Sequence, residues 1–204
     1  MHTSIDMDAS QISLLREAFR EFRSSDRAVL EIPVGDDMRT KHKVPYRVLF
    51  HGLRRPGYYL RHVIARVAQM IDYSPFKILI YRLIGFRIGK GVYISPDVIL
   101  DTQFPRFVEI GDYVVLGWGS KIFVHDYDGV VYRIGRVKIG AGSVIGGFSF
   151  IRAGVTIREN SLVKLGSRIF VGESQDVVSL DELRAKFESQ SRSDLPADTR
   201  MRQQ

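Results

Sequence analysis

The sequence predicts an all-β protein whose central part is a β-solenoid, with helices added at both ends. The prediction rests on residues 139–169, where an aliphatic residue recurs at every sixth position and a serine or valine follows four places after each of the first five. The aliphatic positions are Ile139, Ile145, Ile151, Ile157, Val163 and Ile169. This spacing fits neither an amphipathic helix, which repeats about every 3.6 residues, nor an isolated half-buried strand, which repeats about every two. It is typical of short strands that each add one aliphatic side chain to a stacked internal ladder.

The same period begins earlier, at Ile88, and divides the chain into four coils of three hexapeptides. The predicted coils are 88–105, 110–127, 139–156 and 157 to about 174. Two interruptions, residues 106–109 and 128–138, each follow the third hexapeptide of a coil. Both therefore leave the solenoid at the same corner, and loops that project from a rigid scaffold are common places for functional sites.

Helical segments are expected on both sides of the solenoid domain, 88–174. In the N-terminal extension, 1–87, apolar residues at helical spacing predict a helix over about 9–23, and a short strand over 28–34 follows before a polar loop. Two more apolar runs predict helices between Leu60 and Ile84. The C-terminal segment, 175–204, is predicted to form a short helix over about 179–190 and then a polar tail.

The two helices before the solenoid have two interpretations. In the first, they cover the open end of the solenoid, where the first coil would otherwise expose aliphatic side chains. In the second, they rest on a membrane surface that carries a lipid-linked acceptor, through tyrosine and phenylalanine residues with basic neighbours. The aromatic residues concerned are Tyr58, Tyr59, Phe76 and Tyr81.

Composition narrows the possible classes of partner and compartment. Lys and Arg total 30 against 23 acidic residues, a net charge of +7 that would suit nucleic acid, an anionic membrane surface or a polyanionic cofactor. We do not expect nucleic acid, because no basic run is interleaved with aromatic residues. The absence of cysteine excludes disulfides, thiolate metal sites and a cysteine nucleophile. We expect a cytoplasmic protein, with peripheral membrane contact as an option, because charged residues interrupt the most apolar segment and the N-terminus lacks signal-peptide features.

His125 is the residue in the coils best suited to acid–base chemistry. It occupies the fourth position of the hexapeptide before the longer interruption, a position expected to face outwards, and the acids Asp126 and Asp128 flank it. The pKa of an imidazole suits it to take a proton from a hydroxyl. Asp126 or Tyr127 could orient the ring or replace it as the base. The alternative is a surface histidine without a function. No metal is expected, since the histidines show no ligand spacing.

The repeats also carry a resemblance to a known family. Three segments, GFRIGKGVYISPDVILD, IGDYVVLGWGSKIFVHDYD and VKIGAGSVIGGFSFIRAGVTIRENSLVKLGS, resemble the hexapeptide-repeat acyltransferases, and within them the maltose and galactoside O-acetyltransferases. The resemblance covers residue 85 to about 172. It implies a left-handed parallel β-helix, a homotrimer, and acetyl-CoA bound as co-substrate in a groove between subunits. It also implies that His125 is the general base on the acceptor hydroxyl.

The resemblance further indicates which residues bind the cofactor. Gly147 and Leu165 match positions that contact the pantetheine arm, where they would act through main-chain groups. The Thr-Lys pair that reaches the nucleotide phosphates in the family is missing, because the chain reads Gly166-Ser167-Arg168-Ile169-Phe170-Val171. The charge of the missing lysine would then come from Lys164 or Arg168, with Arg158 as a further candidate, because a phosphate needs a cation within reach more than a fixed residue type.

The sequence therefore predicts a coenzyme-A-dependent O-acetyltransferase that modifies a sugar hydroxyl of a saccharide or glycolipid. Two alternatives stay open. One is N-acetylation of an amino sugar nucleotide by the same site. The other is a trimeric scaffold that has lost catalysis, which the missing Thr-Lys pair favours and the position of His125 disfavours.

Overall fold

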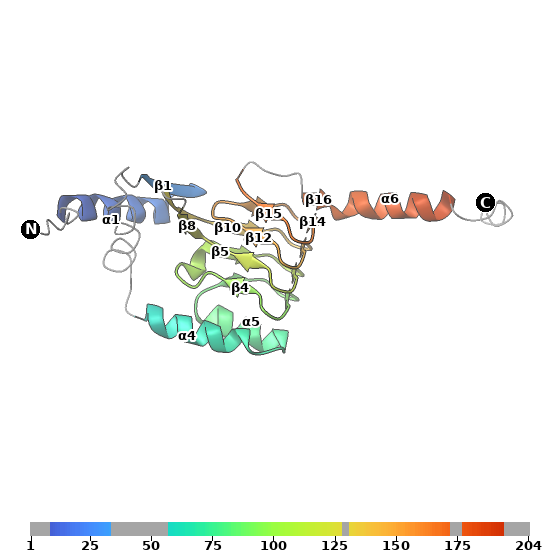
Figure 1. The fold of residues 1–204 in the computed structure, drawn as a ribbon, viewed down its shortest axis with the longest axis horizontal. Helices are drawn as coiled ribbons and strands as arrows, with labels where there is room; N and C mark the ends of the chain where they lie inside the picture. Colours follow the sequence, from blue (N-terminus) through green and yellow to red (C-terminus); the bar gives the residue numbers. More distant parts are fainter. Residues whose placement is uncertain (1–8, 34–56, 128–130, 172–176, 194–204) are drawn as a thin grey trace, which may run out of the picture.

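The computed structural model describes residues 9–33, 57–127, 131–171 and 177–193. Their centre is a stack of short parallel strands in three sheets, and every coil contributes one strand to each sheet (Figure 1). The first two coils consist of β2 (Arg87–Ile88), β3 (Tyr93–Ile94) and β4 (Ile99–Leu100), then β5 (Val108–Ile110), β6 (Val115–Leu116) and β7 (Lys121–Ile122). The last two consist of β10 (Val137–Ile139), β11 (Val144–Ile145) and β12 (Phe150–Ile151), then β13 (Thr156–Ile157), β14 (Ser161–Val163) and β15 (Arg168–Ile169). The predicted all-β core of parallel strands is confirmed.

The six-residue period has the register that the sequence predicts. In each sheet the aliphatic residues of successive coils lie directly over one another, as in the ladder Ile94, Leu116, Ile145 and Val163. All four side chains are fully buried. Burial of a side chain of this size stabilises the fold by roughly 1.5–3 kcal/mol, so the three ladders form the main core.

Small residues at the corners link one coil to the next. Ser143 and Ser149 are completely buried, and their hydroxyls donate to the carbonyls of Arg158 and Lys164 at 2.8 and 2.9 Å. Buried hydroxyls need such partners to offset their lost hydration. The corner serines therefore stabilise the stack and are not available as nucleophiles.

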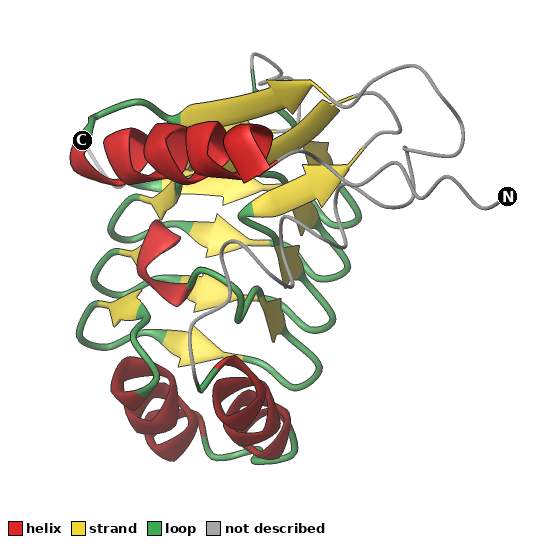
Figure 2. Cartoon of the chain, turned by 90° about the vertical axis from the view of Figure 1, so that its left-hand side faces the viewer, coloured by secondary structure: helices red, strands yellow, loops and turns green. Residues whose placement is uncertain are grey.

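Helix α5 (Ser74–Leu83) closes the lower end of the stack and packs beside α4 (Tyr58–Gln69), as Figure 2 shows. The Ser74 hydroxyl accepts the Ile94 N–H at 2.9 Å, and the buried Lys77 donates to the Ser95 carbonyl at 3.3 Å. Arg82 donates to the Ile88 carbonyl at 3.0 Å. The polar side chains of α5 thus satisfy backbone groups that the first coil cannot pair with another strand.

Both interruptions leave the stack after the third strand of a coil, as predicted. The first forms a short 3₁₀ helix, η2 (Pro105–Phe107), and the second forms a hairpin of β8 (His125–Tyr127) and β9 (Val131–Gly135). Strand β1 (Val29–Pro33) pairs antiparallel with β9 and completes a three-stranded sheet. The predicted second coil is therefore too long, because residues 125–127 belong to the hairpin.

The terminal elements lie close to their predicted places. Helix α1 (Ala9–Ser24) is held by Arg136, whose guanidinium donates to the Phe22 carbonyl at 2.9 Å and lies 4.6 Å from the Phe22 ring centre. At the upper end, β16 (Val177–Ser179) pairs antiparallel with β14, and α6 (Leu180–Ser193) extends away from the stack (Figure 1). The end of the predicted fourth coil, 172–174, the tail after Ser193 and the predicted polar loop lie outside the described residues. No helix in the described ranges combines the length and apolarity needed to cross a bilayer.

Two hydroxyls on the buried side of α5 provide a matched test of how the end is closed. The Ser74 hydroxyl satisfies a strand N–H, whereas the fully buried Tyr81 hydroxyl has no hydrogen-bond partner among the described residues, and burial raises the pKa of Tyr81 to about 12. We expect Ser74→Ala to lower the free energy of unfolding by about 1–3 kcal/mol, because it orphans the Ile94 N–H. Tyr81→Phe should leave it unchanged or raise it slightly. Urea unfolding of both variants measures the difference, and equal losses would contradict this account of the end cap.

Candidate functional site

His125 lies at the corner where the second coil leaves the solenoid and the β8–β9 hairpin begins. Its ring stands between two aromatic rings, with centroid distances of 6.4 Å to Phe104 and 6.1 Å to Tyr132. Its side chain is 27% exposed. The histidine is therefore part-buried between these two rings, and part of its side chain stays accessible from outside.

Asp101, from the coil below, holds the ring of His125. Its carboxylate is hydrogen-bonded to His125 Nδ1 and also accepts the backbone N–H groups of Val124 at 3.1 Å and Gln103 at 2.9 Å. The side chain is only 3% exposed. A buried carboxylate with three donors is fixed in place, so it sets the orientation of the imidazole.

The Asp101–His125 contact determines which nitrogen can do chemistry. An Nδ1–H that donates to the carboxylate leaves the lone pair of the neutral ring on Nε2, the nitrogen that can accept a proton. Burial lowers the pKa of His125, but the hydrogen bond and the charge of Asp101 raise it more, with a smaller contribution from Asp126. The pKa of His125 therefore lies above its ordinary value of 6.5. The pair has the composition of a general base with its orienting carboxylate.

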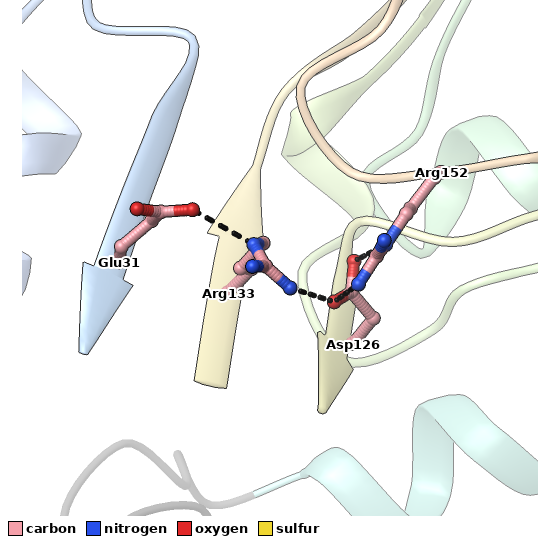
Figure 3. A network of polar contacts seen from close by, with 4 residues as sticks. All are labelled: Glu31, Asp126, Arg133 and Arg152. Carbon is pink, nitrogen blue, oxygen red and sulfur yellow. Dashed lines mark hydrogen bonds and ion pairs between the residues drawn. The ribbon is translucent and has the colours of Figure 1, made fainter. Parts of the chain in front are cut away.

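The carboxylate of Asp126 bonds to two arginines, whereas the sequence suggests that it orients His125. Its carboxylate accepts two hydrogen bonds from Arg152, at 2.6 and 2.7 Å, and lies 3.4 Å from Arg133, which also bonds Glu31 at 2.8 Å (Figure 3). The hypothesis that Asp126 orients His125 is corrected by this geometry, because Asp101 makes that contact. Asp126 instead joins β8 to β9, and through Arg133 to β1, which fixes the hairpin that carries His125.

The predicted cofactor residues lie at another corner of the solenoid. The Gly166 N–H donates to the Gly147 carbonyl at 2.9 Å, and Leu165 beside them is 76% exposed. Lys164 and Arg168 in the last coil are also exposed. Gly147, Lys164 and Leu165 thus lie at one corner, whereas Arg168 lies in β15, in the sheet β4–β7–β12–β15 that separates this corner from that of His125.

Two aromatic residues that the sequence analysis did not single out belong to the same corner. Trp118 and Phe148 are 54% and 60% exposed, and their ring centroids are 5.2 Å apart. The Trp118 indole also donates to Asp97 at 2.7 Å. The Phe148 N–H donates to the Trp118 carbonyl at 2.8 Å, so the exposed apolar residues Trp118, Phe148 and Leu165 come from adjacent coils at this corner. Within the described ranges, no cluster of three or more His, Asp or Glu side chains is arranged to hold a metal ion.

The electrostatic coupling of Asp101 and His125 can be measured directly. We expect an NMR titration of the His125 ring to give a pKa above 6.5, and Asp101→Asn to lower it, because the carboxylate stabilises the imidazolium. Asp126→Asn should lower the pKa less. Since the folded pKa is raised, this contribution to stability is complete at pH values below the unfolded pKa, about 6.5, and is lost as the pH rises through the folded pKa. The stability gap between wild type and Asp101→Asn should therefore narrow at alkaline pH, and a pKa that is unchanged in Asp101→Asn would contradict the coupling.

The chain is similar to known proteins over about half of its length. No family model matches the chain. A protein of Bacillus subtilis (strain 168) named "Putative acetyltransferase YvoF" is 32% identical over 107 residues, which are 50% of this chain and 62% of the relative. The chain thus matches less than two thirds of the length of that relative.

Two solved structures are also similar. A maltose O-acetyltransferase from Clostridium difficile 630 has a TM-score of 0.44 and 20% identity, over 55% of this chain and 74% of the other. A hexapeptide-repeat-containing acetyltransferase, VCA0836 from Vibrio cholerae, has a TM-score of 0.32 and 12% identity, over 52% of this chain and 84% of the other. The similarity to the Bacillus protein confirms the acetyltransferase resemblance that the hexapeptides indicated.

Proposed function

We propose that this protein is a coenzyme-A-dependent acetyltransferase that transfers acetyl to a sugar hydroxyl, with His125 as the general base. The observation that supports the proposal most is the buried Asp101 carboxylate on His125 Nδ1. A buried carboxylate is costly unless its partners offset the desolvation. A scaffold has no need for such a pair at a part-buried histidine, so the geometry favours an enzyme over the non-catalytic alternative.

The reaction is a direct transfer in the proposed mechanism. His125 Nε2 takes the proton of the acceptor hydroxyl while the oxygen attacks the carbonyl carbon of the acetyl thioester. The tetrahedral intermediate then breaks its C–S bond, and the coenzyme A thiolate takes the proton from the imidazolium. Asp101 stabilises the positive charge that develops on the ring between these steps. The acetyl group ends on oxygen, and no covalent intermediate with the protein is needed.

The co-substrate is proposed to bind at the corner of Gly147 and Leu165. Main-chain groups there would hold the pantetheine arm, and Lys164 or Arg168 would meet the phosphates. Because one sheet lies between this corner and His125, we propose a homotrimer of left-handed β-helices in which His125 of one subunit faces the cofactor corner of the next. The N-acetylation alternative uses the same residues, and a panel of hydroxyl and amine acceptors distinguishes the two.

The role of His125 has a direct kinetic test. We expect His125→Ala to lower kcat/KM for acetyl transfer by roughly a hundredfold or more, because general-base catalysis contributes about 10²- to 10⁴-fold. Release of coenzyme A thiol, measured with saccharide acceptors, gives the rate. As a control, the variant should keep its circular dichroism spectrum and its stabilisation by acetyl-CoA. Undiminished turnover would remove His125 from the mechanism.

The cofactor corner is tested by ligand-induced stabilisation. Acetyl-CoA at millimolar concentration should raise the Tm, because a ligand that binds only the folded protein stabilises it. The double variant Lys164→Gln/Arg168→Gln should show a smaller rise, since it removes the candidate phosphate cations. Lys138→Gln/Arg184→Gln removes the same charge at exposed sites elsewhere and should behave as wild type. A shift that is equal in both double variants would exclude the proposed phosphate contacts.

A further inference from the structure

The outward face of helices α4 and α5 is unusually apolar for an end cap. At least half of each side chain on this face is exposed, and the two helices form the base of the molecule in Figure 2. The face comprises Tyr59, Leu60, Val63, Val67, Met70, Tyr73, Phe76, Leu79 and Leu83. We call this set the apolar face. Exposed apolar patches of this extent mark interaction surfaces, because monomeric proteins rarely keep them in water.

The charge around the apolar face is positive. Over residues 57–84 the basic residues that are not buried are Arg61, Arg66 and Arg82, against Asp72 as the single acid, while Lys77 is buried against the first coil. Two tyrosines, Tyr59 and Tyr73, stand at 64% and 70% exposure among the aliphatic residues. Apolar side chains with tyrosines and arginines are the composition of helices that lie in the interface of an anionic bilayer.

A pocket of about 440 Å³ opens beside the apolar face, between α1, α4 and η2. Its walls are mostly apolar and include Ile64 and Phe107, and three arginines, Arg23, Arg61 and Arg106, line it without any acid among the described lining residues. Arg61 Nε is buried and has no hydrogen-bond partner in the described part of the chain. A buried guanidinium nitrogen without an acceptor is costly, so the site favours an anion such as a phosphate.

The pocket is connected both to the apolar face and to the candidate active site. Leu60 and Leu83 belong to the apolar face and also line the pocket. On the other side, Phe104 lines the pocket and packs edge-on against the His125 ring, and Gln103 beside it donates its N–H to Asp101. A ligand in this pocket therefore lies between a surface suited to lipid and the Asp101–His125 pair.

We propose that this pocket binds the phosphate head group of an anionic lipid, presented by a bilayer on which the apolar face rests. The arginines hold the phosphate, and the chain passes out along Leu60 and Leu83. If the proposed acetyltransferase function holds, on which this last step rests, the acceptor is a saccharide carried on a lipid phosphate. Its hydroxyl reaches His125 from the pocket side while acetyl-CoA occupies the other corner.

The lipid site is tested by vesicle sedimentation without acetyl-CoA. The protein should bind vesicles of phosphatidylcholine mixed with phosphatidylglycerol and bind phosphatidylcholine vesicles much less. Arg61→Gln/Arg106→Gln should weaken binding about tenfold or more, because each arginine near an anionic surface contributes about 1 kcal/mol, or fivefold. Lys138→Gln/Arg184→Gln has the same net charge as this double variant and should lose less of its vesicle binding. Equal losses would mean that net charge alone attracts the protein, and no binding of wild type to the mixed vesicles would overturn the proposal.

A matched pair of variants tests how much the apolar face contributes to vesicle binding. Leu83→Gln, on the apolar face, should reduce vesicle binding several-fold, whereas Val171→Gln, at a comparably exposed position on the last coil, should not. Sedimentation velocity of both variants identifies the rival occupant. If Leu83→Gln dissociates an oligomer and the wild type does not bind vesicles, the face is an interface between copies and the lipid proposal fails.

Failure of the lipid site can be distinguished from failure of the transferase. His125→Ala should bind vesicles as wild type does, because it leaves the pocket arginines in place. A protein that binds vesicles but is not stabilised by acetyl-CoA would refute the proposed activity and keep the lipid site. A protein that is stabilised by acetyl-CoA but does not bind vesicles would refute the lipid site and keep the proposed activity.

Discussion

The stacking of each coil on the next is the constraint on which the rest of the structure depends. Strands of two or three residues cannot stand alone, since their backbone groups and aliphatic side chains are satisfied only by the coils above and below. The ends of such a stack are open edges that must be closed. The protein closes the lower edge with polar side chains of α5 and part of the upper edge with the antiparallel strand β16.

The same constraint explains where the candidate site lies. An insertion within a strand would break the ladders, whereas an insertion at a corner leaves the register of the next coil intact, as the pairing of Ile110 with Ile139 across the second interruption shows. The β8–β9 hairpin uses this freedom to carry His125. Asp101 reaches it from one coil below, and the Asp126–Arg152 pair fixes the hairpin to the coil above. Three separate parts of the stack therefore hold one imidazole.

The parts that depend on the period could be predicted, and the parts that depend on contacts between distant segments could not. The ladders, the corner insertions and the place of His125 all follow from counting in sixes. Asp101 could not be identified from the sequence, because the coils contain several acidic residues and its spacing does not distinguish it from the others. Only the strand register shows its place: Leu100 pairs with Ile122, so Asp101 lies one coil below residue 123 and close to His125. The sequence suggests Asp126 because it is the neighbour of His125, but adjacent side chains in a strand point to opposite sides. The pairing of β1 with β9 joins segments about a hundred residues apart and has no local pattern.

The burial pattern of α5 connects the end cap with the proposed lipid surface. The open edge of the first coil presents backbone N–H and C=O groups, so the side of α5 that faces it must be partly polar: Ser74, Lys77 and Arg82 all bond to that edge. The apolar residues Phe76, Leu79 and Leu83 are left to face outwards. A cap that only had to be compatible with water would carry polar residues at these positions, since nothing in the closure of the stack requires them to be apolar. Their apolarity is thus a separate feature from the capping function, and contact with a lipid surface supplies the physical reason for it.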